Sequence, residues 1–231
     1  VRRRVFKALW YDLPIARAGM LTTISTFSAE SIERYTGYPA SRIALVPPPL
    51  SSEFTRNDRE FNAARPRILQ VGTTANKNIV RVIRALAGLE VELVLIGELT
   101  ELQRGELAAA GIAYENRTGI TREALIEEYQ RADIVMFASV YEGFGMPIIE
   151  AQAVGRPVIT SDRCSMPEAA GGAAILVDPE DTGAIRGAVE GIATSRDRRE
   201  ELVAKGYDNA RRFLPQRIAD QYAELYRQLA R

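Results

Sequence analysis

From residue 66 onward, short apolar runs alternate with stretches in which apolar residues recur every three to four positions. Runs that are apolar throughout predict strands buried on both faces, as in a parallel sheet. We expect strands at residues 67–71, 91–96, 112–114, 133–138, 157–160 and 174–177. Helices are expected between them, at residues 79–89, 100–110, 122–131 and 147–154. The alternation favours a doubly wound α/β domain, whose ligands sit at the carboxyl ends of the strands.

The segments on either side of this domain have a different pattern. Residues 1–46 predict a helical stretch, a strand at 20–24, a helix at 29–35 that Ser25 or Ser28 caps, and a strand at 43–46. Three prolines at 47–49 exclude a helix or a central strand, so residues 47–65 are expected to be a linker. The tail predicts helices at 181–193, 196–212 and 216–230. We therefore divide the chain into residues 1–46, 47–65, 66–212 and 213–231.

Composition narrows the chemistry that the chain can perform. Thirty basic and thirty acidic residues balance, so no general attraction to nucleic acid exists and no such partner is expected. There is no histidine and a single cysteine, Cys164, which excludes a histidine base, an internal disulfide and the common metal sites. No metal site is therefore expected. No apolar run approaches the roughly 20 residues of a membrane-spanning helix, and we expect a cytoplasmic location.

The N-terminus suggests a longer protein. The chain begins with Val1 and opens in a helical pattern, which predicts a piece of a longer chain, with the loss of only a few residues as the alternative. Basic residues there alternate with apolar ones: Arg2, Arg3, Arg4 and Lys7 with Val5, Phe6, Leu9 and Trp10. A helix of this kind either packs its apolar face on the protein or lies on a membrane surface.

The segment with the most chemical information is residues 139–151. It follows a buried strand and opens a helix at Pro147, and its glycines, Gly143 and Gly145, allow a close backbone approach to a ligand. Backbone N–H groups at such a helix start favour phosphate, and the carboxylates of Glu142 and Glu150 accept hydrogen bonds from sugar hydroxyls. The alternative is a purely structural turn, in which the glycines only make the bend and Glu150 interacts with the helix dipole.

This segment resembles the signature of retaining glycosyltransferases of the two-domain GT-B type, most closely family four of the sequence-based classification. The resemblance continues through residues 23–25, 43–47, 71–78, 157–162 and 166–179, in the expected order. It implies the C-terminal, Rossmann-like half of a GT-B fold, with residues 1–46 as the last elements of the N-terminal acceptor domain. It also implies that the final helix crosses back onto that domain.

The resemblance assigns roles to particular residues. It implies that Glu142 bonds hydroxyls of the transferred sugar and that Glu150 binds the ribose. Backbone at Gly143, Phe144, Gly145 and Met146 would line the sugar and the diphosphate. Lys77 would pair with the diphosphate, so that Glu142 and Lys77 are the expected catalytic residues.

One position departs from the family pattern. Many members carry an arginine after the glycine that is Gly72 here, and this chain has Thr73 and Thr74 instead. Their hydroxyls or amides are expected to donate to phosphate without a charge. Arg81 and Arg84, in the next helix, are expected to be surface residues.

A second loop is expected beside the nucleobase. The resemblance places residues 114–120 there, after a strand, with Asn116 and Thr118 as donor-binding candidates. Glu168 is expected to begin a helix rather than to take part in the chemistry.

The implied function is transfer of a hexosyl group from a GDP- or UDP-linked sugar to a glycan or lipid-linked glycan, with retention of configuration and no cofactor. The acceptor-binding half would lie outside this chain, which would leave the chain inactive alone, and a peripheral membrane contact would come through that half. Two alternatives stay open: a non-catalytic nucleotide-sugar-binding module or subunit, and a GT-B sugar-nucleotide epimerase.

Overall fold

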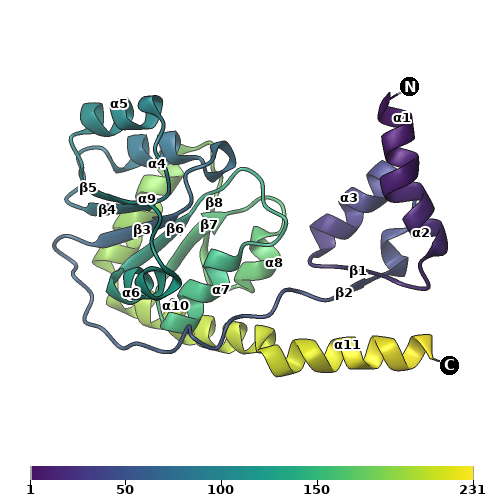
Figure 1. The fold of residues 1–231 in the computed structure, drawn as a ribbon. Coiled ribbons are helices and arrows are strands. Elements are labelled where there is room, and N and C mark those ends of the chain that lie inside the picture. The colour runs from purple at the N-terminus through teal and green to yellow at the C-terminus, as the bar shows by residue number, and fades with distance from the viewer. Residues whose placement is uncertain (1, 231) are drawn as a thin grey trace.

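A computed structural model of the chain, which describes residues 2–230, contains a six-stranded parallel sheet (Figure 1). Its strands run in the order β5-β4-β3-β6-β7-β8. They are β3 (Arg67–Val71), β4 (Glu92–Ile96), β5 (Ala113–Arg117), β6 (Ile134–Phe137), β7 (Val158–Ser161) and β8 (Ile175–Val177). The order reverses direction between β3 and β6, which is the doubly wound, Rossmann-like topology expected from the sequence.

Helices cover both faces of this sheet, and each strand sends alternate side chains to the two sides. Ile68 of β3 joins the core beneath α4 (Ile79–Leu86), α5 (Glu101–Ala110) and α9 (Thr182–Thr194). The next residue, Leu69, joins the core beneath α6 (Arg122–Arg131), α7 (Met146–Val154), α8 (Met166–Ala170) and α10 (Arg196–Ala210). Burial on both faces explains why the strands read as unbroken apolar runs.

Residues 21–45 form a small unit of their own, the β1–α3–β2 unit. A helical stretch of α1 (Arg2–Lys7), the π-helical turn η1 (Ala8–Asp12) and α2 (Leu13–Arg17) precedes it. Strand β1 (Leu21–Thr23), helix α3 (Thr26–Thr36), the 3-10 turn η2 (Ala40–Arg42) and strand β2 (Ile43–Leu45) follow, and the two strands pair in parallel. Ser25 caps α3, because its side chain accepts the N–H of Ser28 at 3.1 Å.

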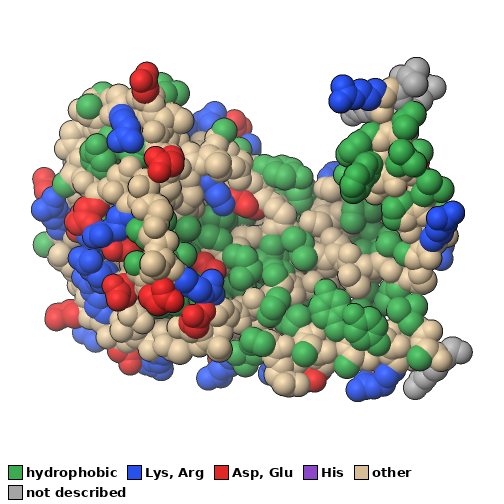
Figure 2. All heavy atoms as spheres, viewed as in Figure 1, with side chains coloured by type: hydrophobic (Ala, Val, Ile, Leu, Met, Phe, Trp, Pro, Cys, Tyr) green, Lys and Arg blue, Asp and Glu red, His purple; other side chains and the backbone are tan. Residues whose placement is uncertain are grey.

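The apolar face of the first helices is exposed. Figure 2 shows hydrophobic side chains gathered over these helices and over the last helix, α11 (Pro215–Leu229). Phe6 is 50% exposed and Trp10 is 69% exposed. Within residues 2–230 much of this face is exposed, and both the packed-helix and the membrane-surface interpretations stay predictions. No helix in this range is long and apolar enough to cross a membrane.

The linker has no helix or strand, but it is fixed to the α/β domain. Leu50 and Phe54 are buried in the core beneath α7, and Leu50 N–H donates to the carbonyl of Phe213 at 2.8 Å. Phe213 belongs to the 3-10 turn η4 (Arg211–Phe213), which separates α10 from α11. The linker and the start of α11 are therefore held together.

Several predicted boundaries are wrong. For α8 only a helix start at Glu168 was predicted, without bounds; α4 ends three residues early at Leu86, and β5 extends to Arg117 instead of residue 114. The short α8 has only five residues, too few to show a helical period. Strand β5 lies at the edge of the sheet and carries polar residues, so it lacks the apolar run that marks the others.

Candidate functional site

The candidate site lies where the strand order reverses, at the carboxyl ends of β3 and β6. In open parallel sheets this switch point leaves a crevice, because the chain leaves the two strands in opposite directions. The β3–α4 loop (residues 72–78) and the β6–α7 loop (residues 138–145) meet there. These are two of the segments on which the family resemblance rests.

Hydrogen bonds join the two loops into one surface. Val140 N–H donates to the carbonyl of Asn76 at 2.8 Å, and Asn76 Nδ2 donates in return to the carbonyl of Tyr141 at 3.1 Å. Asn78 sits at φ 61° and its buried Nδ2 donates to the carbonyls of Ala138 and Pro179. Asparagine tolerates this left-handed backbone better than most residues. The residues after β3 and β6 therefore hold each other in place.

Lys77 and Glu142 contact each other within this surface. Lys77 Nζ donates to Glu142 Oε1 at 2.7 Å, and both side chains are largely buried. The ammonium also lies 4.4 Å from the centroid of the Phe137 ring. The lysine stem passes over Gly72, where a Cβ atom would come within 2.9 Å of Lys77 Cε. Gly72 also has φ 86°, a backbone conformation that strains other residues, so a side chain there would be strained and would shift the lysine.

The ion pair leaves bonding capacity unused on both partners. A lysine ammonium has three N–H donors, and one of them goes to Glu142. Glu142 Oε1 also accepts from Asn76 Nδ2 at 3.0 Å, whereas Oε2 accepts from no group within residues 2–230. The site can therefore offer N–H donors to an anion and a carboxylate oxygen to a hydroxyl.

The carbonyl groups of the β6–α7 loop point into the protein. Ser165, which is fully buried, has its hydroxyl 2.9 Å from the carbonyl of Glu142 and 3.0 Å from that of Phe144. The carbonyl of Gly143 lies 2.7 Å from the hydroxyl of Ser25. The C=O and N–H of one peptide point in opposite directions.

Fixing these carbonyls therefore turns the following N–H groups the other way. These N–H groups belong to Gly143, Phe144 and Gly145, and they donate to no acceptor in the described part of the chain. Met146, the first residue of α7, adds another free N–H at the positive end of the helix dipole. Free N–H groups at a helix start suit an anion.

Glu150 lies deeper, on the second turn of α7. Its Oε2 accepts the hydroxyl of Tyr129 at 2.7 Å, and its Oε1 accepts from no group in the described residues. Burial raises the pKa of Glu150, while the Tyr129 bond and the nearby Arg122 act in the opposite direction. Glu150 is outside the first turn of the helix, so the helix-dipole alternative is wrong.

The threonines that replace the family arginine behave differently from the expectation. The Thr73 hydroxyl donates to the carbonyl of Glu98 at 2.6 Å, and the Thr74 hydroxyl donates to Asn76 Oδ1 at 2.7 Å. Neither hydroxyl is free for phosphate. Their backbone N–H groups donate to no acceptor within residues 2–230, so only the amide part of the prediction stands.

Asn116 was expected in a loop, but it lies inside β5. Its Nδ2 donates to the carbonyls of Leu95 and Gly97, so this amide supports the end of β4. The polar composition of residues 114–117 reflects an edge strand and not a loop. Thr118 does follow the strand and is exposed.

Three other expectations concern charged residues. Glu168 is in the first turn of α8, and its Oε2 accepts the N–H of Thr26 at 2.8 Å. Arg81 and Arg84 are at the surface as expected, paired with Glu180 and Glu106. No described group of three acidic, histidine or cysteine side chains is placed to hold a metal ion.

Sequence reasoning missed the supporting residues. Tyr129 and Ser165 act through the carboxylate and the carbonyls that they contact, and neither residue type nor spacing signals such a role. Ser25 was predicted only as a helix cap.

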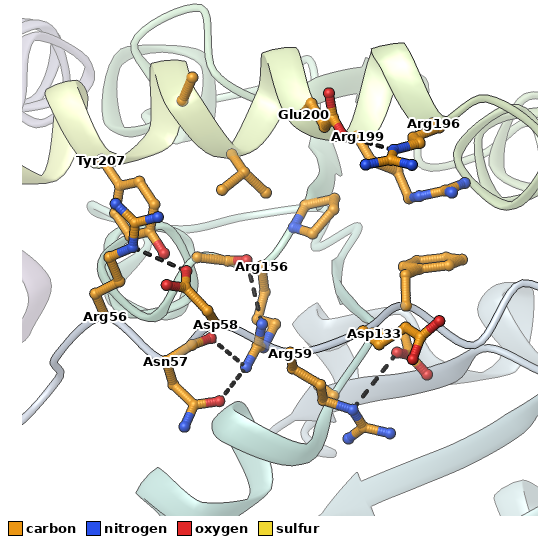
Figure 3. A pocket seen from close by; sticks show the side chains of 17 residues that line it. Arg56, Asn57, Asp58, Arg59, Asp133, Arg156, Arg196, Arg199, Glu200 and Tyr207 are labelled. Atoms are coloured by element: carbon orange, nitrogen blue, oxygen red, sulfur yellow. Dashed lines mark hydrogen bonds and ion pairs between the residues drawn. The ribbon is translucent and has the colours of Figure 1, made fainter.

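Two cavities of about 570 Å³ lie outside the switch point. One, at the amino ends of β6 and β7, lies between the linker and α10 and is shown in Figure 3. Its arginines are occupied: Arg156 donates to carbonyls of Tyr129 and Gln130, and Arg196 pairs with Glu200. The other cavity lies beside Phe144, between β2 and α11. Only this second one touches the β6–α7 loop.

Free N–H groups and an ammonium suit an anion, and half-occupied carboxylates suit hydroxyls. The protein is thus an α/β domain whose switch point has the chemistry to fit a phosphorylated ligand with hydroxyl groups. The family follows from comparison. Residues 51–209 match the model of the glycosyl transferases group 1, and the chain belongs to this family.

Curated relatives span nearly the whole chain. The chain is 29% identical to the O-antigen chain mannosyltransferase B of Escherichia coli, over 98% of its own length and 65% of the relative's. It is also 29% identical to the MMP alpha-(1->4)-mannosyltransferase of Mycolicibacterium hassiacum, over 89% of the chain and 53% of the relative. The chain thus spans less than two thirds of these proteins.

Solved structures share the fold. The sucrose-phosphate synthase of Thermosynechococcus elongatus superposes with a TM-score of 0.80 at 23% identity, covering 92% of this chain and 59% of that one. Anabaena HepE, solved in complex with UDP and glucose, also gives 0.80, at 15% identity, with 91% and 64% covered.

Proposed function

We propose that this chain supplies the donor-binding half of a glycosyltransferase that moves a hexosyl group from a nucleoside diphosphate sugar to an acceptor hydroxyl, with retention of configuration. The observation that carries the proposal is the meeting of Lys77, Glu142 and the free N–H groups of the β6–α7 loop at the switch point. The two named mannosyltransferases, and the binding of UDP and glucose by HepE on the same fold, support it.

Each group has a role that follows from its chemistry. The bond between the anomeric carbon and the diphosphate oxygen breaks during transfer, so negative charge grows on the diphosphate. The Lys77 ammonium and the N–H groups of Gly143, Phe144 and Gly145 are fixed before the reaction and stabilise that charge where it develops. Glu142 Oε2 accepts a hydroxyl of the transferred sugar, and Glu150 Oε1 accepts a ribose hydroxyl.

The acceptor is proposed to bind outside the α/β domain. All the groups named above lie on residues 72–150, and none of them is placed to orient an acceptor hydroxyl toward the anomeric carbon. Orientation of that kind supplies a large part of the rate enhancement in bimolecular transfer. The complete active site therefore needs a second domain, of which the β1–α3–β2 unit would be a part.

A titration tests the donor half of the proposal. The purified chain is titrated calorimetrically with GDP, UDP, GDP-mannose and UDP-glucose, with guanosine and uridine as controls. We expect one nucleoside diphosphate to bind and its nucleoside to bind more weakly. Absence of binding by every nucleoside diphosphate would overturn the proposed function.

A transfer assay tests the proposed need for a second domain and the proposed retention of configuration. The chain is incubated with the labelled nucleotide sugar that binds and with extracted acceptors, and we expect binding without a glycoside product. Efficient transfer by these 231 residues would show that no second domain is needed. In a protein that does transfer, the anomeric configuration of the product, read by NMR, should equal that of the donor.

A further inference from the structure

The turn between β1 and α3 contacts the β6–α7 loop across more than 110 residues of sequence. We call residues 24–28 the 24–28 turn. Ser25, which is fully buried, donates its hydroxyl to the carbonyl of Gly143 at 2.7 Å, and the Ser28 hydroxyl lies 3.2 Å from the same oxygen. The sequence separations of these two contacts are 118 and 115 residues.

Two further contacts fix the same turn. Thr26 N–H donates to Glu168 at 2.8 Å, and the Phe27 ring packs edge-on against Tyr141, with 5.5 Å between centroids. The turn therefore contacts the β6–α7 loop at Gly143 and Tyr141 and α8 at Glu168, and Ser25 also caps α3.

The Gly143 carbonyl shares its peptide plane with the N–H of Phe144. A carbonyl oxygen has two lone pairs, and the hydroxyls of Ser25 and Ser28 both lie within hydrogen-bond distance of it. Ser25 Oγ also lies 2.9 Å from Ser28 Oγ, so the two serines hold this oxygen as one hydrogen-bonded unit. The N–H of Phe144 then points away from the 24–28 turn, and it donates to no acceptor within residues 2–230. Glycine at 143 has no side chain to fix this plane, so without the two hydroxyls the peptide can rotate.

We propose that Ser25 and Ser28 are positioning residues: they orient the Gly143–Phe144 peptide so that its N–H faces the diphosphate sugar. This inference rests on the proposed function. It makes donor affinity depend on residues of the N-terminal unit that do not touch the donor. The contribution is specific to the phosphate and sugar part of the ligand, because the Gly143–Phe144 peptide belongs to the loop proposed to bind that part.

The test uses the Ser25→Ala/Ser28→Ala double variant of the full chain. Affinities for GDP, UDP and their nucleosides are measured by calorimetry. We expect about a tenfold loss for the nucleoside diphosphate that the unmodified chain binds, on the scale of one hydrogen bond to a charged group, and no change for its nucleoside. Equal losses for both ligands, or no loss, would overturn the proposal.

The matched control is Ser31→Ala, since the Ser31 hydroxyl donates only within α3, to the carbonyl of Phe27 at 2.8 Å. Should the double variant unfold, Ser28→Ala alone leaves the cap of α3 intact and is expected to give a loss of about two- to threefold.

A second measurement does not depend on any ligand. The amide resonance of Phe144 in the free chain should shift in the double variant and stay in place in Ser31→Ala. An unmoved resonance would overturn the positioning role. Failure of the unmodified chain to bind any nucleoside diphosphate, with the resonance shift present, would instead count against the proposed function alone.

Discussion

The two edges of the six-stranded sheet use charged residues in opposite ways. At the carboxyl edge, Lys77 and Glu142 form one ion pair and keep bonding capacity free. Toward the amino edge, Arg67 pairs with Glu92, Glu115 and Glu128 at 2.7 to 3.2 Å. The comparison shows that charged residues alone do not identify a ligand-binding site. Hydrogen-bond donors and acceptors without a partner at the end of a strand are the better indication of such a site.

The cluster around Arg67 joins three strands and a helix. Arg67 begins β3, Glu92 begins β4, Glu115 lies in β5 and Glu128 in α6. Arg67 and Glu128 are almost fully buried, with 7% and 5% of their side chains exposed. Buried charges need such partners, because desolvation costs several kcal/mol for each ion. This network therefore fixes the sheet: the terminal nitrogens of Arg67 are taken by the three carboxylates, and only its buried Nε donates to no group in the described residues.

The largest expected effect comes from breaking this cluster. Arg67→Met leaves three carboxylates without their shared cation, so we expect a loss of about 3–5 kcal/mol in the free energy of unfolding. For a chain of this size that corresponds to a fall of roughly 6–20 °C in Tm, measured by differential scanning calorimetry.

The control for that change is Arg84→Met, which removes an exposed ion pair with Glu106. It should cost less than about 1 kcal/mol. Similar losses in the two variants would show that the Arg67 cluster is no more structural than a surface pair.

The next largest effect is a loss of ligand affinity at the carboxyl edge of the sheet. Lys77→Ala should lower nucleoside diphosphate affinity by roughly 30- to 100-fold, since a charge-assisted hydrogen bond is lost, and leave nucleoside affinity unchanged. Calorimetric titration measures both. Lys205→Ala removes the same charge from an exposed pair with Glu201 and serves as control. If nucleoside and diphosphate affinities fell together, a folding defect would be the explanation.

A smaller effect is expected at Glu150, with opposite signs for binding and stability. Burial raises the pKa of Glu150 in the folded state. At a pH above that pKa, the ionised carboxylate therefore destabilises the folded state relative to the unfolded state. Glu150→Gln removes this cost and should raise unfolding stability at pH 7 by about 1 kcal/mol or less. The same change should weaken nucleoside diphosphate binding by about tenfold.

Thermal unfolding and titration of the Glu150→Gln variant check these two signs, with the exposed Glu127→Gln as control. A variant that loses stability while keeping its affinity would contradict both assignments for Glu150.

The smallest effect is the acid response of the amino-edge cluster. Hydrogen bonds from Arg67 hold the pKa of Glu115 at about 2, below its ordinary value of 4.5. Its contribution to stability is therefore present above pH 4.5 and is lost as the pH falls toward 2. Urea unfolding at pH 5 and pH 3 should show a smaller drop in Glu115→Gln than in the unmodified chain. Equal drops would refute the assignment.

The sequence predicted the sheet well because its central strands are buried on both faces and read as apolar runs. It placed Gly72, Lys77 and Glu142 at strand ends, where parallel strands bring them together. It failed at β5, since an edge strand carries polar residues such as Asn116. It could not predict the carbonyl contacts of Ser165, because such bonds depend on where distant loops fold.

The linker and α11 both pass from the α/β domain to the N-terminal unit, and the bond between Leu50 and Phe213 ties them at one place. Phe213 also packs edge-on against Phe144, with 5.5 Å between ring centroids. Because these two connections are tied at one place, the N-terminal unit cannot rotate freely relative to the α/β domain. The β6–α7 loop lies beside this place, whereas the apolar helices α1 and α2 lie far from it (Figure 1). Phe213 therefore connects the point where the linker and α11 meet to the β6–α7 loop, through its contact with Phe144.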